Sequence, residues 1–249
     1  NSREIAAPFV LPTLAGDWDF QQEWGLGQDS YFFVFKAQGY AYSAELWDSP
    51  VKQMLGNGPQ NVHYFYLSYN NTAEQDVTQL KERIDGELAE LGAAKEAYWQ
   101  ERLHYVPVNA YDLDNWVSDV VKAYGFFAFG IDRFQRLREV GLLMPVLMQN
   151  ATAELFHLTY QARAFNFEWD REHQLAAADE EFPPTVITVF DQEHFGGHKK
   201  VEVEFPDAET MAGFDHMEFD LTMGCTDNKD DNCGEWDYKS HVFLCLPDD

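Results

Sequence analysis

The residues whose types and spacing best suit chemistry lie near the end of the chain, in segment 225–238. Cys225 and Cys233 are spaced so that they could close a small loop as a disulfide. The polar stretch between them carries three carboxylates, and oxygen atoms on a flexible loop are the ligands that Ca²⁺ prefers. These carboxylates are Asp227, Asp230 and Asp231. Calcium binding is therefore one hypothesis for this loop, although no glycine stands at the sixth place as in an EF-hand; a stapled surface turn is the other.

Cysteine usage and two sequons favour the secretory pathway. All three cysteines lie near the end of the chain, so pairing Cys225 with Cys233 leaves Cys245 without a partner in that segment. An odd cysteine in an oxidised segment suggests a partner elsewhere, beyond residue 249 among other places. N-glycosylation sequons begin at Asn70 and Asn150. We therefore expect an extracellular or secretory-pathway glycoprotein.

The net charge of −26 is the strongest bulk property of the chain. Such a surface repels phosphate backbones, so nucleic acid is not an expected partner. No stretch approaches the roughly 20 apolar residues that span a bilayer, so no membrane span is expected. Hydrophobic residues make up 45% of the sequence, which argues against a disordered chain. Cations, basic proteins and neutral glycans remain compatible partners, and solubility alone is the other explanation of the charge.

Strands alternate with helices over residues 20–148. The predicted strands are 31–36, 62–69, 104–108 and 126–132, followed by a turn and short strand in 133–141. The predicted helices are 44–55, 73–102 and 113–123. Pro50 would kink or restart the first helix, Gly86 or Gly92 could break the second, and Gly125 would end the third. This alternation predicts an α/β module built from βαβ units around a largely parallel sheet.

The pattern changes after residue 148. Residues 1–19 are a lead-in, 149–184 are a connecting segment, and 185–249 form a β-rich module with predicted strands at 185–190, 201–205, 217–223 and 238–244. Consecutive strands without helices indicate a sandwich or jelly roll. These few strands cannot cover both faces of a sandwich or jelly roll, so the second module looks incomplete.

The first module resembles the thioredoxin-like fold, in its redoxin and SCO-like branches. The similarity rests on the order of elements, on the segments 31–36 and 62–69, and on a strand that ends at Asp132 before a turn. In that family a pair of cysteines follows the first core strand, where a helix N-terminus lowers a thiol pKa. Residues 37–43 stand at that position here and contain no cysteine. Because these cysteines are missing, the resemblance implies that the chain is not a thiol oxidoreductase. The functions that remain for this module are a scaffold or a binding cleft lined by Tyr40, Tyr42 and Trp47.

Residues 185–245 resemble the first domain of the peptide-N-glycosidase F family. The similarity rests on two cysteines that bracket a polar loop and on the triplet Glu235-Trp236-Asp237, which opens the next strand. That family hydrolyses the amide between a glycan and asparagine, a reaction that needs a carboxylate to position or activate water. The resemblance implies that Asp237 is catalytic, with Glu235 a weaker candidate, and that the loop is closed by the disulfide.

Two departures weaken the enzyme hypothesis. The family has an arginine directly after the catalytic aspartate, where this chain has Tyr238, and its helper glutamates lie in a second jelly roll that this sequence lacks. We therefore expect a non-catalytic extracellular binding or structural protein, associated with glycans, glycoproteins or an extracellular assembly. A glycoamidase whose remaining site residues lie outside this sequence is the alternative. The sequence identifies no cofactor for either hypothesis, and calcium in the loop is the one candidate.

Overall fold

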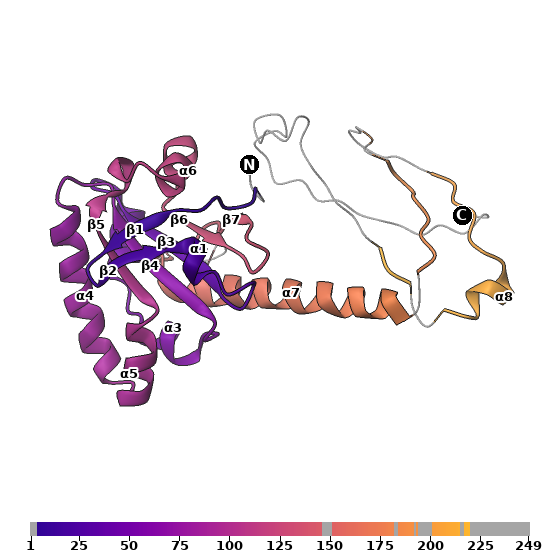
Figure 1. Cartoon of the computed structure of the whole chain (residues 1–249), viewed down its shortest axis with the longest axis horizontal. Coiled ribbons are helices and arrows are strands. Elements are labelled where there is room, and N and C mark those ends of the chain that lie inside the picture. The colour runs from indigo at the N-terminus through magenta and orange to yellow at the C-terminus, as the bar shows by residue number, and fades with distance from the viewer. Residues whose placement is uncertain are drawn as a thin grey trace. The chain divides into compact units, whose positions relative to one another are not determined.

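The computed structural model describes residues 4–145, 151–181, 184–191, 193, 201–214 and 217–219. The chain divides into two compact units, one of residues Ser2–Ala177 and one of Ala178–Asp249 together with Asn1. The first holds nearly all of the regular secondary structure (Figure 1).

The first unit is built on a five-stranded mixed sheet with the strand order β5-β4-β3-β6-β7. The strands are β3 (Ser30–Lys36), β4 (Val62–Ser68), β5 (Leu103–Asn109), β6 (Ala128–Ile131) and β7 (Leu137–Glu139). β3, β4 and β5 run parallel, whereas β6 and β7 are antiparallel to their neighbours. The predicted strands are confirmed, but the sheet is mixed rather than largely parallel, because β6 runs antiparallel to β3 and then forms a hairpin with β7.

The predicted helices are found between the strands, with outer ends that differ from the predicted ones by up to three residues. They are α2 (Ala41–Asp48), α3 (Lys52–Asn57), α4 (Ala73–Ala89), α5 (Ala93–Gln100) and α6 (Trp116–Tyr124), with a short 3-10 turn η1 (Ala110–Asp112). α3 starts anew after Pro50, and Gly92 separates α4 from α5 with a φ of 88°. Gly125 ends α6 in the left-handed region, where glycine has no Cβ to clash. Gly86 lies inside α4 and does not break it.

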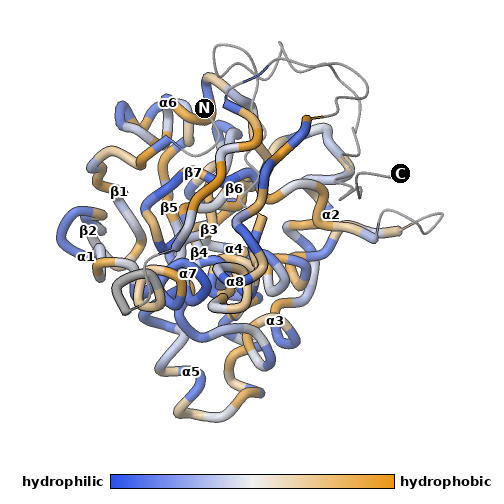
Figure 2. The backbone as a smooth tube through the Cα atoms, turned by 90° about the vertical axis from the view of Figure 1, so that its right-hand side faces the viewer, coloured by the Kyte–Doolittle hydropathy of each residue, from blue (hydrophilic) through white to orange (hydrophobic). Residues whose placement is uncertain are grey.

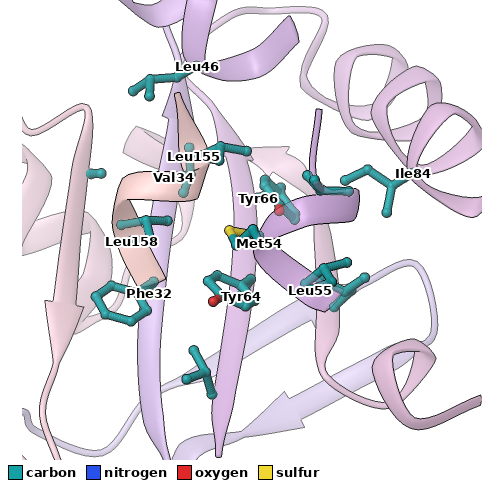
Figure 3. Packing of buried hydrophobic residues seen from close by; sticks show 14 of the residues in the cluster. Phe32, Val34, Leu46, Met54, Leu55, Tyr64, Tyr66, Ile84, Leu155 and Leu158 are labelled. Carbon is teal, nitrogen blue, oxygen red and sulfur yellow. The ribbon is translucent and has the colours of Figure 1, made fainter. Parts of the chain in front are cut away.

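Both faces of the sheet are buried, because aromatic residues point to either side of β3 in turn. Phe32 and Val34 face a cluster that includes side chains of α2, α3 and α4 and Tyr64 and Tyr66 of β4 (Figure 3). The opposite face carries Phe33 and packs against α6. α6 is well separated from α4 and α5 in Figure 1, and α5 shows both hydrophobic and hydrophilic residues in Figure 2.

The lead-in contains a hairpin that the sequence analysis did not predict. β1 (Val10–Thr13) pairs antiparallel with β2 (Gly16–Asp19), and α1 (Phe20–Glu23) follows. Trp18 and Phe20 are buried against the sheet on the α6 side. The lead-in is therefore part of the core of the first unit.

A long helix, α7 (Leu158–Glu181), follows the short turn η2 (Leu155–His157) within the predicted connecting segment. Its Phe165 is buried against Phe32 at a ring separation of 5.4 Å. Its Glu168 accepts two hydrogen bonds from Arg138 of β7, at 2.6 and 2.9 Å, and Arg138 also reaches the buried Asp132 at 2.8 Å. These contacts fasten α7 to the β6–β7 hairpin.

The second unit contains one short helix, α8 (Ala208–Met211), among its described residues after α7. The strands predicted at 185–190 and 201–205 are not found, and the expected jelly roll is not confirmed. Isolated strands are stable only when paired with others, and Val186 and Phe205 are exposed here. The strand predicted at 238–244, and most of the one at 217–223, lie outside the described residues.

Candidate functional site

The position expected to carry thiols is the turn between β3 and α2. Gly39 takes a φ of 85°, which reverses the chain at the end of the strand. The Ser43 hydroxyl closes the turn, because it accepts the Ala37 N–H at 2.8 Å and donates to the Phe35 carbonyl at 3.1 Å. The turn is thus held by a serine hydroxyl and contains no nucleophilic sulfur.

A buried carboxylate, Asp76 in the first turn of α4, organises the polar groups beside this turn. It accepts hydrogen bonds from the Ser68 hydroxyl at 2.7 Å, the Asn70 amide at 2.8 Å and the Lys36 ammonium at 3.0 Å. The Asp76 side chain is 9% exposed and that of Lys36 is 28% exposed. Burial raises the pKa of Asp76, but the three hydrogen bonds and the Lys36 charge outweigh it and lower the pKa below its ordinary value.

Asn70 joins the two loops of this edge. Its Oδ1 accepts the Gln38 N–H at 3.0 Å, while its Nδ2 donates to Asp76. Its own N–H donates to the Ser68 hydroxyl at 3.1 Å. The sequon asparagine is therefore a structural link between the loop after β3 and the loop after β4.

Tyrosine and phenylalanine rings cover the same edge of the sheet, where β3, β4 and β5 end and β6 begins. Tyr40 packs on Phe127 at 5.3 Å, Tyr69 stacks on Tyr111 at 4.8 Å, and the Tyr69 hydroxyl donates to the carbonyl of Phe126. We call this surface the aromatic edge, and its members are Tyr40, Tyr42, Tyr69, Tyr111, Tyr124, Phe126 and Phe127. Three of its rings, those of Tyr40, Tyr111 and Tyr124, are among the exposed large side chains.

The cleft expected between Tyr40, Tyr42 and Trp47 does not form. Trp47 is 4% exposed and packs in the core against Tyr66 at 5.9 Å. Tyr42 is half-buried, and its hydroxyl accepts the Leu143 N–H at 2.9 Å. Trp47 points into the core because α2 lays its buried face on the sheet there, so only Tyr40 of the three is exposed.

Sequence analysis missed Lys36 and Asp76, although one signal for Asp76 exists. Asp76 stands beside Val77 on the buried face of α4, at the helical spacing that also places Ala73 and Leu80 there. A carboxylate in such a position requires hydrogen-bond donors. Their identity follows only from the sheet register, which pairs Lys36 with Ser68.

A second polar cluster lies at the opposite edge, where β4 and β5 begin. Nδ1 of His63 and Nε2 of His104 are 2.9 Å apart, and the two rings are stacked at 5.3 Å. Among the described residues no group of three or more His, Cys, Asp or Glu side chains is arranged to hold a metal ion. The two histidines form a hydrogen-bonded pair.

The residues predicted from the cysteine-rich segment lie outside the described residues. They are Asp237, Glu235, Cys225, Cys233, Cys245, Asp227, Asp230 and Asp231, together with Asn150. Of the helices that the structure describes, none combines the length and the hydrophobicity needed to cross a bilayer.

No protein-family model matches the chain, and no curated protein matches it. Among solved structures it is similar to the thioredoxin domain of a thiol-disulfide oxidoreductase from Bacteroides vulgatus, with 12% identity, 55% of this chain and 86% of that chain covered, and a TM-score of 0.35. It is also similar to a hypothetical protein from Sinorhizobium meliloti, with 17% identity, coverage of 61% and 78%, and a TM-score of 0.33. A third is the yeast mitochondrial 1-Cys peroxiredoxin, with 13% identity, coverage of 60% and 83%, and a TM-score of 0.32.

Proposed function

We propose that the first unit is a non-catalytic binding module that docks a cationic segment of a partner protein on the aromatic edge. The observation that carries the proposal is the set of exposed tyrosines, Tyr40, Tyr111 and Tyr124, at the edge of a chain with net charge −26. The sequence has no cysteine before Cys225, so the first unit holds no thiol for exchange chemistry.

The aromatic edge is suited to binding because its loops are ordered before a partner arrives. The Asn70 side chain ties the turn after β3 to the loop after β4, and the Asn109 side chain donates to the Tyr69 carbonyl at 2.9 Å. Loops that are already ordered lose less conformational entropy on binding. Tyrosine adds large contact area with few rotatable bonds, which is why it is enriched in binding surfaces.

Charge complementarity selects a cationic partner. Two exposed carboxylates lie beside the edge, Glu74 in the first turn of α4 and Asp112 in η1. They are opposed by the exposed Lys122 of α6, and Lys36 is already neutralised by Asp76. The faces of tyrosine rings attract Arg and Lys by about 0.5–1 kcal/mol at exposed sites. A partner segment with several such residues would gain from each ring and from the overall field of the chain.

The test is binding of a fluorescent peptide that alternates Arg and Ser, followed by anisotropy. Tyr40→Ala and Tyr111→Ala should each weaken binding about 2- to 5-fold, whereas Tyr40→Phe should bind like the parent because it keeps the ring. Tyr160→Ala is the matched control, since Tyr160 is an exposed tyrosine of α7 outside the edge. Equal affinity in the parent and both edge alanine variants would mean that the peptide responds only to net charge, and would exclude this site.

The second candidate is the glycoamidase, and it rests on sequence alone. Its support is the triplet Glu235-Trp236-Asp237 after the cysteine-bracketed loop, with Asp237 as the catalytic carboxylate. The test is release of glycan from an asparagine-linked glycopeptide by the natural protein, compared with Asp237→Asn. Release that persists in the variant would exclude Asp237. The extracellular or secretory location is proposed from the sequons and cysteines, and calcium in the loop from Asp227, Asp230 and Asp231.

A further inference from the structure

The His63–His104 pair is built to hold together only while at most one of its rings is protonated. A neutral imidazole has one donor and one acceptor nitrogen, whereas a protonated ring has two donors. The 2.9 Å contact between His63 Nδ1 and His104 Nε2 needs one donor and one acceptor. When both rings carry a second proton, two N–H groups face each other, and the bond is lost.

Apolar rings enclose the pair on the side of the hairpin. Trp18 of β2 lies 5.5 Å from the His104 ring and 6.3 Å from the His63 ring. Phe65 stacks on His104 at 4.3 Å, and Tyr31 of β3 stacks on His63 at 5.2 Å. Rings packed in this way leave little water to solvate a new positive charge.

The charged groups that face the pair oppose protonation on balance. Arg102 precedes β5 and disfavours a positive charge on either ring, while Asp29 lies 4.0 Å from His63 Nε2 and favours one. Arg102 and Arg133 also lie near Asp29 and favour its charged form, and Glu23 of α1 and Asp29 both disfavour ionisation of Tyr31, the ring stacked on His63. Burial first, then His104 and Arg102, lower the pKa of His63 to about 3, and burial and Arg102 lower that of His104 to about 4.

Trp18 makes the pair a contact point for the β1–β2 hairpin. It is buried, and its ring meets Phe65 at 4.7 Å as well as both histidines. The Leu14 N–H donates to the Tyr105 carbonyl at 2.9 Å and so links the hairpin to β5. The Asn115 side chain of the loop before α6 also donates to the Val10 carbonyl at 2.7 Å. Leu11 and Trp18 are buried, so release of the hairpin requires the loss of this packing.

We propose that the His63–His104 pair is an acid-sensitive contact, and that its protonation releases the β1–β2 hairpin from the sheet. Each ring is neutral in the closed state and returns to its ordinary proton affinity once Trp18 has left. From the pKa values above and 6.5 for an open ring, the ratio of open to closed hairpin rises by up to about a thousandfold between about pH 6.5 and pH 4.5.

The surface charge predicts the opposite response, which makes the proposal distinct. A chain with net charge −26 repels itself, and acidification toward its isoelectric point near 4.4 removes that repulsion. Without the histidine pair, packing of the hairpin should tighten or stay constant over this range. Opening of the hairpin on acidification therefore points to a specific group that must take up protons.

The experiment is hydrogen exchange of the full chain, read as protection factors between pH 7 and about pH 4.5. In the parent, protection of residues 10–19 should fall by two to three orders of magnitude while α4 stays protected. The double variant His63→Phe, His104→Phe keeps an aromatic ring at both positions, but neither ring can titrate, so its hairpin should stay protected. Equal loss in parent and double variant, no loss in the parent, or simultaneous loss in α4 would each overturn the proposal.

A second measurement serves if the double variant does not fold. The ring protons of His63 and His104 in the parent can be followed by NMR through the same titration. Their protonation should coincide with the loss of hairpin protection. Histidines that titrate near pH 6.5 while the hairpin stays closed would overturn the proposal.

Discussion

Replacing Asp76 with asparagine tests whether the network beside the β3–α2 turn supports the fold. The change keeps the size of the side chain but removes the charge that offsets Lys36 and one acceptor oxygen. Removing one partner of a fully buried ion pair costs about 3–5 kcal/mol. Lys36 keeps 28% of its side chain exposed, so water reclaims part of its charge. We expect the free energy of unfolding to fall by about 2 kcal/mol.

The matched control is Asp85→Asn in the same helix. Asp85 accepts from Lys81 at 2.6 Å, a pair one helical turn apart whose side chains are 40% and 41% exposed. Exposed pairs of this kind contribute about 0.3–0.5 kcal/mol. Urea unfolding followed by circular dichroism measures both variants. A loss in Asp76→Asn no larger than in Asp85→Asn would refute the idea that burial makes this network important.

The pH dependence gives the same prediction an independent check. The folded-state pKa of Asp76 is lowered, so the stability it adds is present above its unfolded value of 3.8. That contribution is lost as the pH falls below 3.8 through the folded-state pKa. The parent and Asp76→Asn should therefore differ by a constant amount near neutral pH and converge in acid. A difference that does not shrink in acid would mean that the charge of Asp76 is not its source.

Four further substitutions test the packing. Tyr66→Phe should raise the free energy of unfolding by about 1 kcal/mol, because the buried Tyr66 hydroxyl has no hydrogen-bond partner among the described residues. Tyr69→Phe should lower the free energy of unfolding, because the Tyr69 hydroxyl donates to the carbonyl of Phe126. Gly27→Ala should lower the free energy of unfolding by more than about 2 kcal/mol, because the new Cβ would lie 2.2 Å from the Trp169 ring. Gly39→Ala should lower it by about 1 kcal/mol, because Gly39 has the same sign of φ but open space around the new Cβ. Urea unfolding checks all four, and equal costs at the two glycines would contradict the packing at Trp169.

The sequence allowed the strands and helices of the first unit to be predicted because their signals are local. The aromatic run of β3 and the breaks at Pro50, Gly92 and Gly125 act within a few residues. The β1–β2 hairpin could not be found in this way. Its strands are four residues long, and they are stabilised by Trp18 packing on a sheet that forms much later in the chain.

The same distinction explains α7 and the polar clusters. Arg138 of β7 forms an ion pair with Glu168 of α7, and no local sequence pattern predicts this contact. The histidine pair depends on the alignment of β4 with β5, which brings together two residues that look isolated in the sequence. The absence of thiols in the turn after β3, by contrast, was readable directly, because it depends on residue types alone.

Asn70 is both a sequon residue and a member of the Asp76 network, so the usual test of glycosylation is ambiguous here. Asn70→Asp removes the sequon but also replaces the donor to Asp76 with a second carboxylate. Thr72→Ala removes the same sequon without touching the network, because the Thr72 side chain makes no capping hydrogen bond to α4. We expect Asn70→Asp to lower the free energy of unfolding by about 1–3 kcal/mol and Thr72→Ala to change it by less than about 0.5 kcal/mol.

Intact mass and urea unfolding of the two variants then separate the two roles of Asn70. A glycan at Asn70 would be lost equally from both variants in mass, while only Asn70→Asp would lose stability. If Thr72→Ala were destabilised as much as Asn70→Asp, the glycan rather than the hydrogen bond to Asp76 would be the stabilising group. The network would be refuted as a link between the two loops if neither variant lost stability, because the amide of Asn70 would then be dispensable.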